Sequence, residues 1–344
     1  MKHELYIQRC IQLAENAKGN TSPNPLVGSV IVHNDQIIGE GWHAKAGEPH
    51  AEVNAINSVQ DKSLLTESTI YVSLEPCAHF GKTPPCADLI VKNKIPRVVI
   101  GCRDPFDAVN GKGIEKLQAA GIEVLVGVLE KECLELNSAF FTYHTKKRPY
   151  IILKWAQTQD GYLDKLREEK DKGVNWITQP ETKLLVHRWR HEVDAILVGA
   201  KTIINDNPEL TVRLVDGENP IRLVIDPNNR IPKDAKIFSE SGKTIVFTNE
   251  LQASLKNITY FELDSKKLVL ESVLKACYDL QIQSILVEGG AHTLQSFIEA
   301  NLWDEARVLT GASSFGQGLR APSLTLNPAE THRMGKDSLR IFYK

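Results

Sequence analysis

Short apolar, β-branched runs alternate with helix-period patterns along most of the chain, and this alternation is the strongest constraint on its fold. In the first part of the chain it predicts strands at 26–33, 37–42, 69–74, 97–101 and 122–128. Helices are predicted at 3–18, 50–59, 85–93 and 113–120. Asn34-Asp35 separates the first two strands, which favours a hairpin. Together these elements predict an α/β fold with a layered sheet.

A basic, proline-terminated segment at 145–149 has the composition of a linker. With 344 residues, the chain exceeds the usual size of a domain with one hydrophobic core. The alternation then resumes, with predicted strands at 150–155, 195–198, 221–225, 244–248 and 284–287. Helices are predicted at 267–280, at 293–300 and from a Thr178 cap to residue 191. We therefore expect two α/β domains, over residues 1–146 and 149–344.

The composition gives no indication of a polyanionic partner. The chain has 41 Lys and Arg against 43 Asp and Glu, a formal net charge of −2. We expect no nucleic-acid partner and no membrane, because there is no basic stripe and no apolar run of about 18 residues. Six cysteines in so long a chain do not form a disulfide framework, and Cys10, Cys102, Cys133 and Cys277 are predicted to be buried thiols. The expected location is the reducing cytoplasm.

Two cysteines and one histidine have the pattern of a zinc site. His50 opens a predicted helix, Cys77 follows a predicted strand, and Cys86 begins the next predicted helix. Three such ligands match a catalytic zinc site with one open position, whereas a structural site would need a fourth. Glu52 lies two residues after His50, an offset that suits a carboxylate carrying protons instead of binding metal. A structural cysteine and an ordinary histidine are the alternative, but the joint pattern favours one Zn²⁺ per chain.

Several motifs around these residues resemble the deaminase half of the bifunctional riboflavin-biosynthesis deaminase/reductase family. They are PNPLVG at 23–28, GEPHAE at 47–52, EPC at 75–77 and GKTPPC at 81–86. The long loop between the cysteines, ending in TPPC, separates this family from deaminases with a Cys-x-x-Cys pair. The resemblance implies a cytidine-deaminase-like α/β/α domain in which His50, Cys77 and Cys86 bind zinc and Glu52 carries protons.

The resemblance also implies the substrate, a diaminopyrimidinone bearing a ribosylamino 5-phosphate, whose exocyclic 2-amino group is replaced by oxygen. Candidate contacts to this phosphorylated pyrimidine are Asn24 for the base edge, and His43, His79 and Lys82 for the ribose phosphate. Each has an ordinary alternative. Asn24 lies between prolines and suits a turn, and Lys82 suits a solvated loop.

In the second half, the most informative local feature is the glycine pair in VEGGA at 287–291. The pair ends a predicted strand and precedes a helix, where a ligand can approach the backbone and a phosphate can meet unpaired N–H groups. It lacks the spaced glycines of a dinucleotide-binding fingerprint, so a Rossmann fold is not predicted. An ordinary turn after a strand explains the pair equally well.

Further motifs resemble the reductase half of the same family and occur in the family's order. They are KWA at 154–156, DG at 160–161, WIT at 176–178, DAILVG at 194–199, DNP at 206–208, LTVR at 210–213 and EGG at 288–290. The resemblance implies a C-terminal dihydrofolate-reductase-like α/β domain that uses NADPH. It also implies a homo-oligomer, a dimer or tetramer.

The matched positions carry over the family's reductase site. NADPH contacts are implied for Ala156, Trp176, Thr202, Asp206, Gly290, Ala291, His292, Thr293, Leu294, Gln295 and Ser296. Substrate contacts are implied for Lys154, Arg190, Leu210, Arg213 and Glu288. Two arginines can hold a sugar phosphate bidentately. We hypothesise that Lys154 and Glu288 polarise the opened ribose at C1′ and manage the proton that accompanies hydride delivery.

The chain departs from the family in the reductase half. Gln159 replaces a leucine, Val174 replaces a serine that would hydrogen-bond the substrate, and the charged segment 162–173 is longer and is expected to be a solvated loop or short surface helix. A second hypothesis is therefore a deaminase whose C-terminal domain only scaffolds or dimerises. A nucleic-acid deaminase or a non-catalytic zinc domain is a third, which the charge balance disfavours.

Overall fold

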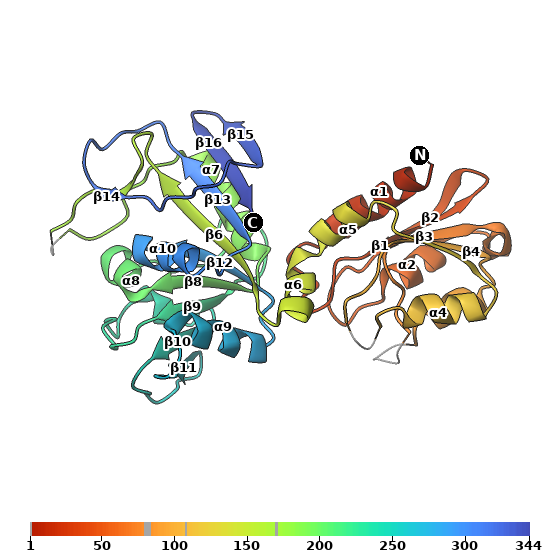
Figure 1. Ribbon diagram of the computed structural model, residues 1–344, viewed down its shortest axis with the longest axis horizontal. Coiled ribbons are helices and arrows are strands. Elements are labelled where there is room, and N and C mark those ends of the chain that lie inside the picture. The colour runs from red at the N-terminus through yellow and green to blue at the C-terminus, as the bar shows by residue number, and fades with distance from the viewer. Residues whose placement is uncertain (1, 79–83, 107–108, 169–170) are drawn as a thin grey trace. The chain divides into compact units, whose positions relative to one another are not determined.

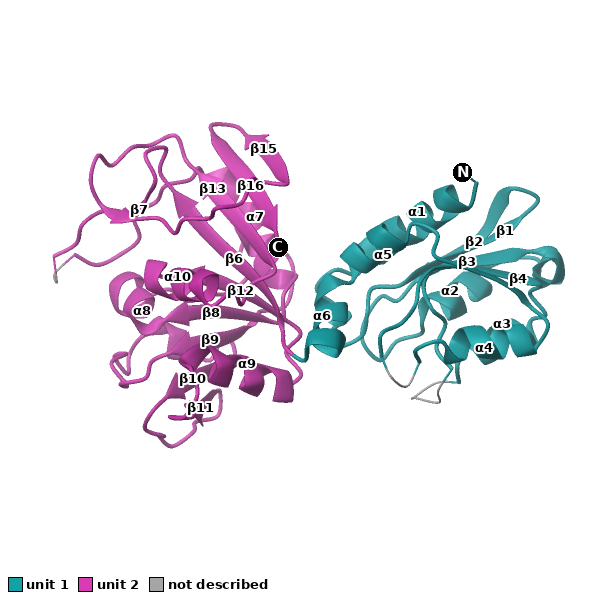
Figure 2. Cartoon of the chain, in the orientation of Figure 1, with its two compact units in different colours: residues 1–147 teal, residues 148–344 magenta. Residues whose placement is uncertain are grey.

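The chain divides into two compact units, Met1–Lys147 and Arg148–Lys344 (Figure 2). The computed structural model describes residues 2–78, 84–106, 109–168 and 171–344. Each unit has its own β-sheet and its own buried apolar clusters. The α/β fold predicted for both halves is confirmed.

The first unit is built on a five-stranded sheet of order β2-β1-β3-β4-β5. Its strands are β1 (Gly28–His33), β2 (Gln36–Trp42), β3 (Thr69–Leu74), β4 (Arg97–Cys102) and β5 (Glu123–Val126). β1 pairs antiparallel with β2 and β3, whereas β3, β4 and β5 are parallel. Asn34 and Asp35 both have positive φ, which matches the two-residue turn of the predicted hairpin.

Helices cover both faces of this sheet, which makes an α/β/α sandwich (Figure 1). They are α1 (Lys2–Glu15), α2 (Ala51–Ser58), α3 (Cys86–Lys92), α4 (Lys112–Ala119), α5 (Glu130–Leu136) and α6 (Ser138–Lys146). One apolar cluster joins α2, α3 and α4 to the sheet, and another joins α1 and α5 to its opposite face. Gly28 allows α1 to cross closely, because a Cβ there would lie 2.0 Å from the Cys10 carbonyl oxygen.

The second unit is built on a nine-stranded sheet of order β11-β10-β9-β8-β12-β6-β13-β16-β15. In chain order the strands are β6 (Tyr150–Gln157), β8 (Ala195–Gly199), β9 (Ile221–Ile225), β10 (Thr244–Thr248), β11 (Ile258–Glu262), β12 (Ser284–Gly289), β13 (Glu305–Thr310), β15 (Glu330–Met334) and β16 (Asp337–Tyr343). From β11 to β13 all neighbours are parallel, and β16 and β15 complete the sheet antiparallel. A separate antiparallel pair joins β7 (Tyr162–Asp164) to β14 (Leu319–Arg320).

Helices also lie on both faces of the larger sheet (Figure 2). They are α7 (Pro180–His191), α8 (Ala200–Asp206), α9 (Val269–Asp279) and α10 (Ala291–Glu299). The largest apolar cluster includes side chains of α9 and α10, such as Val273 and Phe297. Trp189 of α7 and Ile203 of α8 belong to two other clusters. β8 and β12 are parallel neighbours, and α8 and α10 directly follow them. Both helices therefore begin at the same edge of the sheet.

Three local predictions need correction. The segment 145–149 is not a free linker throughout, because α6 extends to Lys146 and ends at Lys147 in the left-handed conformation. Gln179, not Thr178, is the N-cap of α7, because Gln179 is extended and Pro180 directly after it is the first helical residue. The charged segment begins as strand β7, and its described part contains no helix.

Candidate active sites

The three predicted zinc ligands converge at one end of the smaller sheet. His50 is the N-cap of α2, Cys77 follows β3, and Cys86 is the first residue of α3. Their ligand atoms all lie within 4.8 Å of one another, with His50 Nδ1 3.3 Å from Cys86 Sγ and 3.7 Å from Cys77 Sγ. Hydrogen bonds from Cys86 and His50 lower the pKa of the Cys77 thiol, which favours the thiolate that binds metal. This nitrogen and sulfur donor set fits Zn²⁺.

Glu52 lies in the first turn of α2, beside the three ligands, and only 3% of it is exposed. Burial raises the pKa of its carboxyl to about 7, and the nearby Cys77 sulfur adds to this effect. A buried carboxyl of this kind is suited to receive and return a proton near neutral pH.

The structure also brings Asn24 and His43 to this site. Asn24 Nδ2 lies 3.1 Å from His43 Nε2, and His43 Nδ1 lies 3.2 Å from the Pro49 carbonyl oxygen. The His43 ring packs edge-on against His50, with ring centroids 5.4 Å apart. Burial lowers the pKa of His43, so its imidazole is favoured in the neutral form. The other two predicted contacts, His79 and Lys82, lie outside the described residues.

Glu75 is a buried residue of this site whose contacts the sequence does not reveal. Its carboxylate accepts backbone N–H groups from Asp104, Gly111, Gly113 and Ile114, at 3.0–3.4 Å. These bonds tie Asp104, Gly111 and the first turn of α4 to the strand end that leads to Cys77. A Cβ on Gly113 would lie 2.0 Å from the Pro76 carbonyl oxygen, so the start of α4 approaches the strand end closely.

We predict that Glu75→Gln weakens zinc retention. An amide offers one acceptor oxygen in place of two, so some of these N–H groups lose their partner, at a cost of about 2 kcal/mol or more. In the full chain, zinc release followed with a chelating dye should occur at lower urea than in the unchanged protein. Glu123→Gln is the matched control, because Glu123 is exposed and pairs with Arg97 at the surface. Equal urea dependence for both variants would contradict this role for Glu75.

A second cluster surrounds Glu288, near the end of β12. Arg190 makes a bidentate pair with its carboxylate, Nε to Oε1 at 2.8 Å and Nη2 to Oε2 at 2.9 Å. The Lys154 ammonium lies 3.6 Å from Oε2. All three side chains are largely buried. Burial alone would raise the pKa of Glu288, but Arg190 and Lys154 outweigh it and lower that pKa to about 2. Burial also lowers the pKa of Lys154, which makes its proton easier to transfer.

The backbone beside this cluster leaves space for a ligand. Gly289 has a φ of +126°, and a Cβ built there would meet nothing within 4 Å. Gly290, the N-cap of α10, lies against Thr202 of α8, because its Cβ would stand 3.1 Å from Thr202 Oγ1. The N-terminus of the nine-residue helix α10 thus opens beside two glycines, a geometry that fits a phosphate-bearing cofactor.

The other predicted cofactor residues differ in their surroundings. Ala156 lies near the end of β6, and Trp176 is 63% exposed with the Lys183 ammonium 3.3 Å from its ring centroid. Leu294 does not face open space, because its side chain is fully buried in the largest apolar cluster. Asp206 ends α8 and pairs with Arg167 at 2.9 Å.

Arg167 holds part of the charged segment in place through ion pairs, so this part is not the solvated loop that the sequence predicts. Its guanidinium pairs with Asp164 at 2.6 Å as well as with Asp206, and its side chain is largely buried. Dense charge was the only sequence signal, and charge density does not identify which residues pair. Val174, by contrast, is 44% exposed.

Leu210 and Arg213 lie in an irregular segment after α8. Leu210 is buried with a φ of +53°, and its neighbour Thr211 accepts a hydrogen bond from Arg190 Nη1 at 3.2 Å through its carbonyl oxygen. The Arg213 side chain is half-exposed and contacts Glu209 and Thr211. Arg190 therefore links this segment to Glu288.

Comparison of the sequence with known proteins finds matches over both halves. Residues 1–102 match the cytidine and deoxycytidylate deaminase zinc-binding region, and residues 149–339 match the RibD C-terminal domain. The riboflavin biosynthesis protein RibD of Aquifex aeolicus is 43% identical, covering 98% of this chain and 97% of that protein. RibD of Bacillus amyloliquefaciens is 39% identical, covering 93% and 87%.

Solved structures resemble the whole chain. A diaminohydroxyphosphoribosylaminopyrimidine deaminase/5-amino-6-(5-phosphoribosylamino)uracil reductase from Thermotoga maritima has a TM-score of 0.89 and 37% identity, covering 99% of this chain and 98% of that one. Acinetobacter baumannii RibD has a TM-score of 0.88 and 32% identity, with the same coverage. Across the described residues, none of the helices has the length and apolar character needed to cross a membrane.

Proposed function

Because the chain belongs to the RibD family of riboflavin biosynthesis proteins, we propose that its zinc-dependent deamination occurs within residues 1–146 and its NADPH-dependent reduction within residues 149–344. The proposed first substrate is 2,5-diamino-6-(5-phosphoribosylamino)pyrimidin-4(3H)-one, whose 2-amino group leaves as ammonia and is replaced by oxygen from water. The ribosyl chain of the product is then reduced to ribityl. One observation supports the proposal: His50, Cys77 and Cys86 converge in the first unit, and Lys154, Arg190 and Glu288 converge in the second.

In the first unit, His50, Cys77 and Cys86 would hold zinc. Zinc, when bound, supplies a Lewis acid that makes hydroxide available from water near neutral pH. Glu52 takes up the proton from water and delivers it to the departing nitrogen, which balances the hydrolysis. Asn24 and His43, hydrogen-bonded to each other beside His50, would contact the substrate. We assign His79 and Lys82 to the ribose phosphate from the family resemblance alone.

In the second unit, Gly290 and the first six residues of α10, from Ala291 to Ser296, would hold NADPH, which supplies the hydride when bound. The N–H groups of Ala291, His292 and Thr293 have no acceptor within the helix and would bind the cofactor phosphate. The Leu294 N–H already donates to the Gly290 oxygen, and the Leu294 side chain lies in the core. Ala156, Trp176, Thr202 and Asp206 would complete the cofactor site.

The substrate would lie against the Glu288 cluster. Lys154 gives the proton that accompanies hydride addition at C1′, because burial has already lowered its pKa. Glu288 remains ionised between Lys154 and Arg190 and holds both cations in place. Arg190 retains N–H donors beyond its three bonds to Glu288 and Thr211, and with Leu210 and Arg213 it would contact the ribose phosphate.

The full chain, loaded with zinc, is incubated with the diaminopyrimidinone phosphate with and without NADPH. We expect ammonia release in both reactions and NADPH oxidation only after deamination. Ammonia release with no NADPH oxidation, and no NADPH binding at millimolar concentration by fluorescence, would favour a deaminase with a scaffolding second unit. Deamination of cytidine or tRNA, with none of the pyrimidinone, would contradict the proposed substrate.

We further propose that the chain acts in the cytoplasm as a homo-oligomer, a dimer or tetramer, as the family resemblance implies. Light scattering on the purified full chain measures its mass directly. A mass near 38.4 kDa, that of one chain, would contradict the proposed assembly.

A further inference from the structure

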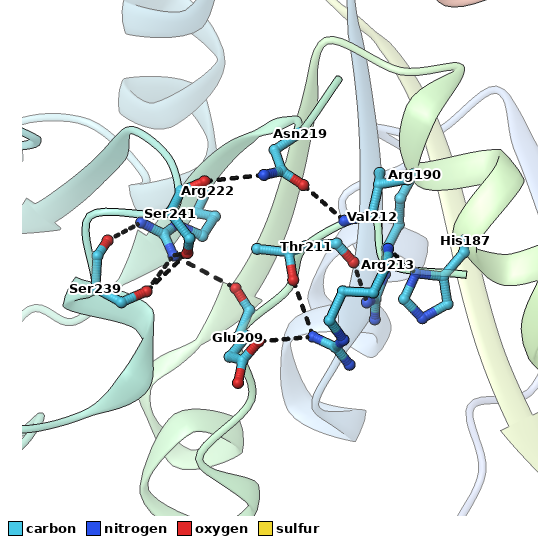
Figure 3. Close-up of polar contacts among 10 residues, drawn as sticks. All are labelled: His187, Arg190, Glu209, Thr211, Val212, Arg213, Asn219, Arg222, Ser239 and Ser241. Carbon is cyan, nitrogen blue, oxygen red and sulfur yellow. Dashed lines mark hydrogen bonds and ion pairs between the residues drawn. The ribbon is translucent and has the colours of Figure 1, made fainter. Parts of the chain in front are cut away.

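The segment 209–213 of the second unit is held through its main chain by side chains from outside it (Figure 3). Such a segment needs partners, because its backbone groups are outside any strand or helix. The four bonds run from Arg222 Nη1 to the Glu209 oxygen (3.5 Å), from Arg190 Nη1 to the Thr211 oxygen (3.2 Å), from the Val212 N–H to Asn219 Oδ1 (2.7 Å) and from the Arg213 N–H to His187 Nδ1 (3.0 Å).

Of the four side chains that hold the segment, His187 is the one that binds the main chain of Arg213. It lies three residues before Arg190 on α7, so both side chains project from the same face of that helix. Only 6% of His187 is exposed. Burial lowers its pKa to about 4, and the charges of Arg190 and Arg213 act in the same direction. The imidazole is therefore neutral at pH 7, and because Nδ1 accepts the Arg213 N–H, its own hydrogen lies on Nε2.

The Arg213 side chain has no comparable anchor. Half of it is exposed, and its Nη1 contacts Glu209 Oε2 at 3.0 Å and Thr211 Oγ1 at 2.9 Å. An exposed ion pair of this kind contributes little to holding a side chain in place. The direction in which the guanidinium points therefore depends on where its main chain is fixed.

We propose that His187 is a positioning residue of the reductase: it fixes the main chain of Arg213 so that the guanidinium meets the substrate phosphate. This inference rests on the proposed function, in which Arg213 binds that phosphate. A bidentate guanidinium–phosphate contact requires correct placement, since both N–H groups must align with phosphate oxygens. Glu209 is displaced from Arg213 when the phosphate dianion arrives.

Two substitutions of His187 separate its two nitrogens. His187→Asn places an amide oxygen near the position of Nδ1 and keeps an acceptor for the Arg213 N–H. His187→Gln extends the amide towards the position of Nε2 and removes that acceptor. In the full chain with NADPH, we expect His187→Gln to raise the KM for the phosphorylated uracil substrate about tenfold, the equivalent of one well-placed contact. The kcat should be nearly unchanged, and His187→Asn should retain the original KM.

The same substrate without its 5-phosphate is the second probe. If His187 acts through Arg213 on the phosphate, His187→Gln leaves the KM for this dephosphorylated compound unchanged. Adding Arg213→Lys to His187→Gln should then raise the KM for the phosphorylated substrate no further than Arg213→Lys alone.

The outcomes distinguish the inference from its premise. If Arg213→Lys leaves the KM for the phosphorylated substrate unchanged, Arg213 does not bind the phosphate and the proposed function of that residue fails. If Arg213→Lys raises this KM but His187→Gln does not, only the positioning role fails. The positioning role also fails if His187→Asn behaves like His187→Gln, or if His187→Gln weakens NADPH binding measured by fluorescence.

Discussion

Replacing Glu52 with glutamine lowers deamination about 10²–10⁴-fold and leaves zinc bound, because a proton carrier contributes about this much to a rate. Glutamine matches glutamate in shape, so the buried position next to Cys77 and Cys86 is still filled. An amide cannot accept a proton from water and return it to the leaving nitrogen. Ammonia release from the diaminopyrimidinone phosphate measures the rate, and elemental analysis of the full chain measures zinc.

Glu67→Gln is the matched control for this variant. It makes the same chemical change elsewhere in the first unit, on an exposed side chain outside the metal cluster. We expect it to retain the original rate and zinc content. If Glu52→Gln loses zinc together with activity, Glu52 holds the metal site together and is not primarily a proton carrier.

Replacing Lys154 with methionine lowers reduction by a comparable factor, about 10²–10⁴, and leaves NADPH binding unchanged. Methionine has nearly the same length as lysine but carries no proton to transfer. The remaining Glu288 carboxylate stays paired, because Arg190 binds both of its oxygens. The variant therefore avoids the large cost of an unpaired buried charge. NADPH oxidation with the deaminated substrate measures the rate, and NADPH fluorescence measures binding.

Lys275→Met is the control. Lys275 is an exposed residue of α9, and its ammonium pairs with the Asp279 carboxylate at the surface. Deamination should proceed at the original rate in both lysine variants, since both substitutions lie in the second unit. Normal NADPH oxidation by Lys154→Met would show that another group supplies the proton.

Local sequence patterns were sufficient to predict an element where its buried side chains recur at a short, regular spacing. The strands at 69–74, 221–225 and 244–248 were predicted with the bounds that the structure has, because each is a short, mostly buried run rich in β-branched residues. α5 was missed because Cys133 is its only buried residue, and the rest of its sequence is dominated by glutamate. α8 was missed because a short helix buries too few residues to show a period.

The same distinction applies to the sites. His50, Cys77 and Cys86 could be predicted because ligand type and order carry the chemistry, whatever the distance between them. The contacts of Glu75 and His187 could not, because their hydrogen-bond partners, such as the Gly113 N–H and the Arg213 N–H, lie in other segments. Charge density predicts a solvated segment around Arg167, because the pairing of Arg167 with Asp206 is set by how the chain folds back and not by spacing.

The separation of the apolar clusters between the two units also has a consequence for inheritance. Among the residues that the structure describes, each apolar cluster lies wholly within one unit. A mutation that destabilises one core therefore lowers first the rate of the reaction in that unit. Two defective alleles, one impaired in each half, can complement each other in the same cell if the deaminated intermediate diffuses between chains.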